Sequence, residues 1–160
     1  RALREARLRA IGPSAARELV ICLLEQVGEP SPALREALFR AVATAVVRSA
    51  DFHPNLVELL AALRQRLGEC EVEELDDSAR SLALIQRLTP VERRVAVQVL
   101  AVACVFDGRI GKKEWAVLAR AYALLGIATP RAAVLGFKAA LLNGDALDRA
   151  HLMRLTPDLP

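Results

Sequence analysis

One turn in the second half of the chain carries the side chains best suited to hold a cation. It has the sequence Phe-Asp-Gly-Arg-Ile-Gly-Lys-Lys-Glu-Trp, in which Glu114 follows Asp107 by seven residues. An EF-hand loop places oxygen ligands at its first, third and fifth positions, glycine at the sixth and glutamate at the twelfth. If Asp107 is fifth, Glu114 is twelfth, but the first and third positions fall on Ala103 and Val105, whose side chains cannot ligate. A complete calcium loop is therefore excluded, and a weak divalent-cation site of Asp107, Glu114 and main-chain carbonyls is left open.

The same turn has an explanation that needs no ligand. Asp107 and Gly108 come at the end of an apolar helix, where glycine readily takes the left-handed conformation that closes a helix. Glu114 then falls in the first turn of the next helix, where its charge favours the positive end of the helix dipole by about 0.3–1 kcal/mol. We therefore expect a well-capped turn whether or not it binds an ion.

A second turn of similar pattern follows an earlier apolar stretch. Asp51 ends that stretch, and Glu58 stands seven residues later, followed by apolar residues at helical spacing. The spacing is consistent with two pseudo-repeated helical hairpins. Asp107 and Glu114, with Asp51 and Glu58 as their counterparts, are our candidates for a metal or partner contact.

Motifs for catalysis are missing from the sequence. The two histidines, His53 and His151, belong to no paired-histidine metal motif, and no P-loop, GxGxxG or GxSxG motif occurs. His53 precedes Pro54 and is expected at a helix start, whereas His151 has no acidic or cysteine partner in ligand register. We predict no catalytic activity and no cofactor, apart from the weak divalent cation.

Cysteine usage and charge restrict the compartment and the partners. Cys22, Cys70 and Cys104 form no CxxC motif, and an odd number fits no closed disulfide framework. We therefore expect a reducing, cytoplasmic setting. The net charge of +3 is too mild for a nucleic-acid-binding face, and the N-terminal arginines are expected to form a solvated helix face. The predicted partners are other proteins or other domains of the same chain.

The elements that position these residues are all predicted to be helices. Hydrophobic residues make up 54% of the 160 residues but aromatic ones only 4%, so Ala, Leu and Val must form the core. The period-two alternation of strands is missing. Ser31-Pro32, Thr89-Pro90 and Thr129-Pro130 each place a capping hydroxyl before a proline at the first helical position, and Glu92 completes a capping box with Thr89.

Both ends of the helices are marked, so their bounds can be predicted. Asp145 and Asp148 precede the last helix, and glycines at positions 28, 68, 126 and 144 are expected to end helices. The fold class is all-α, a single compact bundle of about eight helices. The expected ranges are 1–11, 14–27, 32–49, 54–67, 77–88, 90–106, 112–125 and 130–143, with a short ninth helix at 146–153.

The helices are expected to form one domain over residues 1–155, followed by an irregular tail, 156–160. The acidic linker 69–77 divides this domain into possible sub-units, 1–68 and 78–155. The apolar run from Val95 to Phe106 would be about 18 Å long as a helix, short of the roughly 30 Å of a bilayer core. We therefore predict a buried central helix and no transmembrane segment.

A composite pattern covers residues 90–127. An apolar helix, Val99–Phe106, leads into Asp107-Gly108; Glu114 then opens a helix that ends in Leu125-Gly126-Ile127. This pattern resembles the TerB-like family of helical domains, found in tellurite-resistance and related bacterial proteins and fused to J-domain co-chaperones. Phe106 replaces the small residue usual before the aspartate. Lys112 and Lys113 stand where acids are common, which weakens any acidic metal surface carried over from the family.

The resemblance implies an all-helical, cytoplasmic bacterial module, often in complexes at the inner face of the membrane, with roles in stress response, metal sensing and multiprotein assembly. We therefore expect a non-catalytic TerB-like module serving in stress- or tellurite-resistance-type assembly or in weak metal-ion sensing. Because the chain starts at Arg1 rather than Met, we expect it to be part of a larger protein.

Two other functions remain open from the sequence. The Ala/Leu/Val-rich composition also suits a structural segment of an enzyme or conflict-system protein that mediates oligomerisation and has no ligand of its own. A small-molecule pocket near Trp115 and Tyr122 is the third hypothesis, although these two side chains are expected first as core anchors. The sequence leaves the oligomeric state undetermined.

Overall fold

The computed structural model describes residues 12–48, 53–69 and 78–156. Within these ranges all regular secondary structure is helical, as predicted, and there is no strand. The helices are α2 Pro13–Leu24, α3 Pro32–Arg48, α4 Pro54–Leu67, α5 Ser78–Gln86, α6 Pro90–Val105, α7 Lys112–Leu124, α8 Arg131–Asn143 and α9 Arg149–Leu155. The helix expected at 1–11, residue 49, the linker 70–77 and the tail 157–160 lie outside the described residues.

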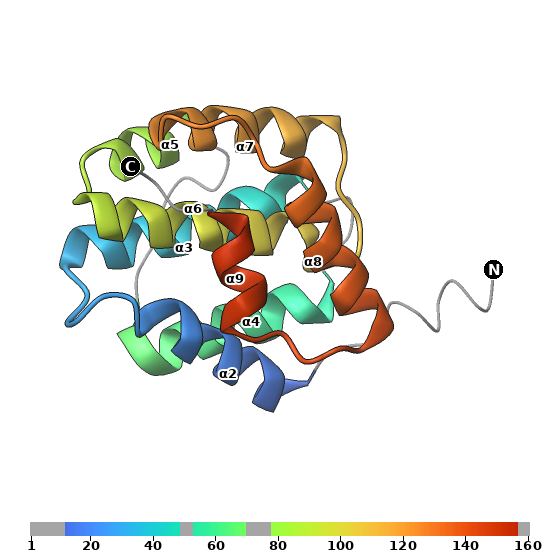
Figure 1. Cartoon of the computed structure of the whole chain (residues 1–160). Coiled ribbons are helices and arrows are strands. Elements are labelled where there is room, and N and C mark those ends of the chain that lie inside the picture. Colours follow the sequence, from blue (N-terminus) through green and yellow to red (C-terminus); the bar gives the residue numbers. More distant parts are fainter. Residues whose placement is uncertain (1–11, 49–52, 70–77, 157–160) are drawn as a thin grey trace.

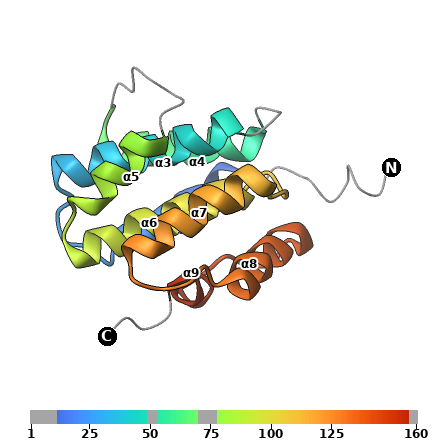
Figure 2. The ribbon, with the colours of Figure 1, turned by 90° about the horizontal axis from the view of Figure 1, so that it is seen from above.

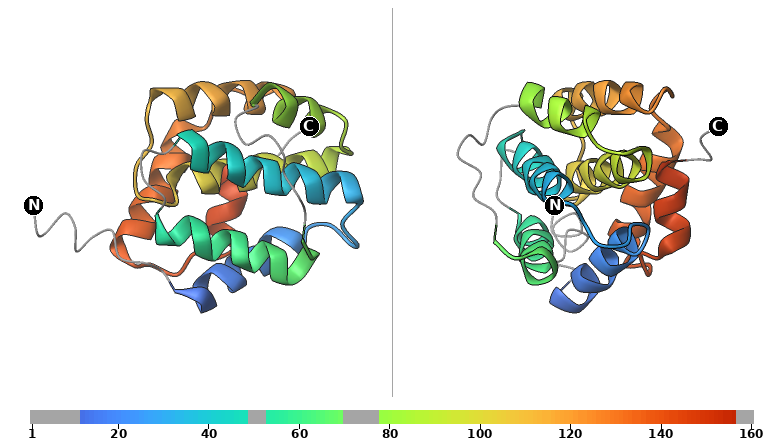
Figure 3. Two further views of the ribbon diagram at one scale, coloured as in Figure 1. Left: turned by 180° about the vertical axis from the view of Figure 1, so that it is seen from behind. Right: turned by 90° about the vertical axis from the view of Figure 1, so that its left-hand side faces the viewer.

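Helix α6 is the centre of the molecule. Every residue from Val95 to Val105 is buried, so the helix is hydrophobic all round and has no solvent face over that length. It packs against α2, α3, α5, α7, α8 and α9 (Figure 3). The predicted buried central helix is confirmed.

The other helices form layers on either side of α6. Seen from above, α3, α4 and α5 lie on one side, α6 and α7 in the middle, and α8 and α9 on the other side (Figures 1 and 2). One hydrophobic cluster runs through these layers, with members from Ala16 in α2 to Leu155 in α9. The cluster therefore draws on both sides of the acidic linker. Among the described residues, no helix is both long and apolar enough to cross a membrane.

Most predicted helix starts are confirmed by the capping contacts. The Ser31 hydroxyl accepts from the Leu34 N–H at 3.1 Å, and the Thr89 hydroxyl accepts from the Glu92 N–H at 3.3 Å. The start at Thr129-Pro130 was wrong by one residue. Helix α8 begins at Arg131, and Pro130, which has no capping side chain, is its N-cap.

The bounds of α2, α5 and α9 also differ from the prediction, and α5 ends at Gln86 rather than at residue 88. Helix α9 begins three residues later than predicted, because Asp148 rather than Asp145 caps it, accepting from the His151 N–H at 3.2 Å. Helix α2 ends at Leu24 rather than at residue 27, and Gly28 does not adopt the positive φ of a closing glycine, unlike Gly68, Gly126 and Gly144.

Candidate functional site

The corner between α6 and α7 has the geometry of a tight helix-to-helix turn. Phe106 is the C-cap of α6, and Gly108 follows with φ of 82°, a value that L residues rarely adopt. The Gly108 N–H donates to the Val105 carbonyl at 2.8 Å, which closes the end of the helix. Gly108 is therefore required by the backbone, as the sequence predicted.

The two candidate carboxylates of this corner both accept bonds from the main chain. Asp107 Oδ1 accepts from the Arg109 N–H at 3.0 Å, and Glu114 Oε1 accepts from the Gly111 N–H at 3.1 Å. Glu114 is the third residue of α7 and is buried. Its carboxylate bonds the main chain of Gly111, the residue just before the helix, as in a capping box. One oxygen of each carboxylate thus holds the turn in place.

A metal role for this pair stays a prediction. Among the described residues, no group of three or more His, Cys, Asp or Glu side chains is placed to hold an ion. Asp107 and Glu114 would supply two carboxylates, and calcium takes six to eight oxygens. Main-chain carbonyls or water would have to provide the remaining ligands.

A buried amide joins this corner to the start of α4. Asn55 Nδ2 donates to the Phe106 carbonyl at 2.8 Å, and the Asn55 side chain is buried. The Asn55 N–H in turn donates to His53 Nδ1 at 3.1 Å, so His53 is the N-cap of α4, as expected for a residue at a helix start. The sequence analysis missed Asn55. The only indication in the sequence was that Asn55 falls on the same helix face as the apolar Leu56 and Leu59.

The counterparts Asp51 and Glu58 differ from Asp107 and Glu114 in position. Asp51 lies outside the described residues. Glu58 is the fifth residue of α4, whereas Glu114 is the third of α7, so Glu58 stands in the second turn and cannot cap as Glu114 does. The shared spacing of seven residues therefore does not give the two glutamates the same role.

The C-terminal end of α9 is held by donors from two other helices. Gln98, fully buried in α6, donates from Nε2 to the Thr156 hydroxyl at 2.6 Å and to the Leu152 carbonyl at 3.4 Å. The Tyr122 hydroxyl of α7 donates to the Leu155 carbonyl at 2.7 Å. Thr156, predicted to begin an irregular tail, is buried. In the sequence, the apolar residues on both sides of Gln98 indicated that this polar side chain is buried.

Gln98 also connects α6 to the end of α2. Its Oε1 accepts from Gln26 Nε2 at 2.6 Å, and the same nitrogen lies 3.1 Å from the Leu23 carbonyl. The Gln26 Oε1 atom is buried without a hydrogen-bond partner. Burying an unsatisfied oxygen is unfavourable, so this amide pair joins α6 to the end of α2 at some cost in stability.

Arg93 stabilises the ends of two helices at once. Its guanidinium donates to the carbonyl of Gln86, the last residue of α5, at 2.6 Å, and to the Leu88 carbonyl, just beyond that helix, at 3.3 Å. It also donates to the carbonyl of Leu124, the last residue of α7, at 3.4 Å. A cation at a helix C-terminus satisfies free carbonyls and favours the dipole. No pattern in the sequence predicts this role of Arg93.

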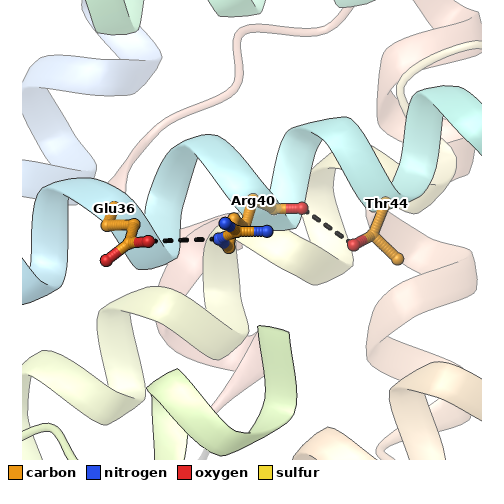
Figure 4. Close-up of polar contacts among 3 residues, drawn as sticks. All are labelled: Glu36, Arg40 and Thr44. Carbon is orange, nitrogen blue, oxygen red and sulfur yellow. Dashed lines mark hydrogen bonds and ion pairs between the residues drawn. The ribbon is translucent and has the colours of Figure 1, made fainter. Parts of the chain in front are cut away.

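A charged pair also lies along α3 (Figure 4). Arg40 is buried, and its Nε lies 3.3 Å from Glu36 Oε1, one turn earlier on the same helix. The Thr44 hydroxyl donates back to the Arg40 carbonyl at 2.8 Å. Glu36 therefore brings a compensating charge to Arg40 within one helix, and the arrangement is structural.

Titratable groups gather where α9 meets α2. His151 Nδ1 lies 2.9 Å from Asp148 Oδ1, which corrects the prediction that His151 has no acidic partner. Hydrogen bonds from the side chain and main chain of His151 lower the pKa of Asp148 below its ordinary value. Burial raises the pKa of the Cys22 thiol, and the negative charge of Glu25 raises it further. Less of the thiol is therefore ionised at neutral pH than in an unperturbed cysteine, which makes it a weaker nucleophile.

The aromatic pair Trp115 and Tyr122 belongs to the core and its edge. Tyr122 is fully buried, and burial raises the pKa of its hydroxyl. Trp115 is half-buried against the core, and the Arg131 guanidinium lies over its ring, 4.4 Å from the centroid. Both rings are therefore engaged by the protein itself, which favours the core-anchor prediction over a ligand pocket.

No protein-family model, no curated protein and no solved structure matches this chain.

Proposed function

We propose that this chain is a non-catalytic, TerB-like helical module that binds protein partners in a cytoplasmic bacterial assembly of the stress- or tellurite-resistance type. The proposal rests on the resemblance of residues 90–127 and on one structural observation. The residues that carry the resemblance form the corner between α6 and α7, which the hydrogen bond from Asn55 to the Phe106 carbonyl joins to α4. A surface whose shape is fixed before binding loses less entropy when a partner docks.

A growth experiment tests the stress-response part of this proposal. The coding sequence is deleted in its host, and growth is compared in rising concentrations of tellurite with and without a plasmid that carries the wild-type gene. We expect the deletion to lower the tolerated concentration and the plasmid to restore it. Equal tolerance in all strains would contradict this part.

The metal-sensing form of the function rests on Asp107 and Glu114, because both carboxylates belong to the same short segment between α6 and the first turn of α7. Calorimetric titration of the purified chain with Ca²⁺, Mg²⁺ and Zn²⁺ tests it. A sensor should release or absorb heat and melt at a higher temperature with its ion, because a ligand that binds only the folded state stabilises it. The Asp107→Asn/Glu114→Gln variant keeps amide oxygens for the main-chain bonds and should lose both effects. No heat and no melting shift in the wild type would dismiss the ion.

Oligomerisation is the alternative function, and exposed apolar side chains are the surface that it would use. Ile21, Val57, Val91 and Leu135 are large hydrophobic residues that are each between 42% and 44% exposed. They lie on four different helices, and exposed apolar residues of this kind are common on monomers. Sedimentation at several concentrations decides the matter, because a monomer at all of them would count against self-association.

A further inference from the structure

Positive charge is concentrated in the segment that contains α7 and α8. Between Arg109 and Asn143 the sequence has six basic residues and one acidic residue, a net charge of +5, and it includes every lysine of the chain. The whole chain carries only +3, so the remaining residues carry a net −2. The basic residues are Arg109, Lys112, Lys113, Arg120, Arg131 and Lys138.

The exposed side of α7 presents much of this charge without an intervening acid. Its exposed residues recur at intervals of three and four, which places them on one stripe of the helix. Three are basic and three are alanines: Lys112, Lys113, Ala116, Ala119, Arg120 and Ala123. The single acid of the segment, Glu114, is buried and turned back to the Gly111 N–H.

Two arginines extend this stripe at its edges. Arg109 is exposed in the corner before α7, and Arg131 is exposed at the start of α8, where its guanidinium covers the Trp115 ring at 4.4 Å. The contact with Trp115 holds the charge of Arg131 next to the first turn of α7. We call the exposed side of α7 together with these two arginines the basic face. Helix α7 itself runs along the upper edge of the molecule in Figure 1.

Helix α7 by itself gains no stability from two of these charges. Lys112 and Lys113 are the first two residues of α7, where the dipole is positive and favours acids. The N-cap, Gly111, has no side chain that would offset the repulsion. A sequence chosen for the stability of α7 alone would place acids at both positions. The lysines therefore require an explanation outside the helix, and a partner of opposite charge supplies one.

We propose that the basic face docks an acidic segment of a partner protein. This deepens the proposed function, on which it rests, by naming the chemistry of the partner. The alanines between the cations are short enough for the apolar side of a partner segment to lie close to α7, while its acids meet Lys112, Lys113 and Arg120. Complementary charge of this kind sets the choice of partner and speeds association.

The same surface suits the other polyanions less well. A bilayer favours a large apolar area beside the basic residues, and Leu135 is the only large exposed apolar side chain on α7 or α8. Single-stranded nucleic acid is bound by aromatic rings on which bases stack, and the Trp115 ring is covered by Arg131.

Fluorescence anisotropy of the purified chain with labelled peptides of about 20 residues tests the proposal. One probe is an amphipathic peptide of Glu, Ala and Leu, and its control has every Glu replaced by Lys. We expect the acidic peptide alone to bind, and to bind about tenfold more weakly at 300 mM than at 50 mM NaCl, because exposed charge pairs are screened. No binding of the acidic peptide at 50 mM NaCl would overturn the proposal.

A pair of matched charge-reversal variants locates the contact. Lys112→Glu/Lys113→Glu/Arg120→Glu should weaken acidic-peptide binding at least about tenfold. Arg17→Glu/Arg66→Glu/Arg87→Glu changes the net charge equally, at exposed positions elsewhere, and should bind nearly as the wild type does. Equal losses in both variants would mean attraction by net charge alone and would overturn the docking face.

Two further measurements separate the remaining outcomes. The α7 variant should melt at the wild-type temperature or higher, because glutamates at the start of α7 suit its dipole, so lost binding cannot be ascribed to unfolding.

Vesicles of phosphatidylserine in phosphatidylcholine and a 20-base DNA strand serve as competing probes. Tighter binding of either one through Lys112, Lys113 and Arg120 would replace the protein partner and overturn the proposal. Tellurite tolerance fully restored by the α7 variant would overturn the docking face while leaving the proposed function in place.

Discussion

Single polar residues in this protein mostly satisfy the backbone. Asp107 and Glu114 bond N–H groups of their own turn, Asp148 caps α9, and Asn55 caps a carbonyl at the end of α6. Each is the type of residue that also forms metal or catalytic sites. Their geometry explains why sequence motifs alone could not distinguish the two uses, since a cap and a ligand both need a polar side chain near a turn.

The capping role of Glu114 leads to the first prediction. Glu114→Ala should lower the free energy of unfolding by about 1–2 kcal/mol, because the Gly111 N–H loses its partner and a buried side chain is removed. Glu114→Gln should lower it less, since its amide oxygen can still accept the bond. Urea denaturation of both variants in EDTA checks this. Equal losses would show that the charge, rather than the bond, is what matters.

Gln98 is the second residue with a measurable role. Gln98→Leu should destabilise the chain by about 1–3 kcal/mol, because Gln26 and the Thr156 hydroxyl would both lose a buried partner. Tyr122→Phe removes a single bond, to the Leu155 carbonyl, and should cost about 1 kcal/mol. Hydrogen exchange should also become faster in α9 than elsewhere in both variants. Unchanged protection of α9 would contradict its attachment through these bonds.

Local contacts at these residues could be predicted and distant ones could not. The bond from the Glu92 N–H to the Thr89 hydroxyl spans three residues and follows from the sequence pattern. Glu92 Oε2 also accepts from the Ser31 hydroxyl at 2.8 Å, a contact that depends on how α3 approaches α6. The roles of Arg93 and Asn55 likewise depend on packing, which the pattern of one helix does not contain.

At the scale of helices, periodicity and end signals gave nearly all the elements. The bounds of α4 and the start of α3 agree with the prediction, and those of α6, α7 and α8 differ by one residue at one end. The larger errors come from the ends of α2, α5 and α9. Capping of α9 at Asp148 rather than Asp145 shows why, because two aspartates three residues apart offer equivalent caps and only tertiary packing selects one.

Helix α8 offers a prediction at this scale. Gly136 lies in its middle, and a Cβ added there would meet nothing within 4 Å. Gly136→Ala should therefore stabilise the chain by about 0.5–1 kcal/mol, because alanine loses less backbone freedom in a helix. Gly108→Ala is the matched contrast, and its φ of 82° should make it destabilising. Thermal unfolding of both variants checks the signs, and a loss of stability at Gly136 would contradict this account.

At the scale of the molecule, α6 makes the bundle one structure. The sequence placed an acidic linker between two possible sub-units, but the packing crosses that linker. Helix α3 from the first sub-unit contacts both α5 and α6 from the second, and α2 contacts α6 and α9. Gln98 adds a polar connection, since its amide bonds Gln26 on one side and Thr156 on the other.

This arrangement predicts that the two segments 1–68 and 78–155 do not fold apart. Separation would expose the apolar side of α3 that α6 covers, and the sides of α6 that α2 and α3 cover. Each buried leucine contributes about 1.5–3 kcal/mol, whereas a whole domain is stable by only about 5–15 kcal/mol. Neither segment can lose several such contacts and remain folded. Circular dichroism of the isolated segments should therefore show little helix.

The intact chain provides the complementary measurement. Its single tryptophan, Trp115, reports on α7 in the second segment, whereas far-ultraviolet circular dichroism reports on every helix. If α6 couples the halves, urea must unfold both signals with one midpoint, because two-state unfolding gives coincident transitions with different probes. Two separate midpoints would mean that the linker divides the chain energetically as well as in composition. A single midpoint, together with unfolded segments, would mean that the buried length of α6 is the common core on which the α6–α7 corner and the basic face both depend.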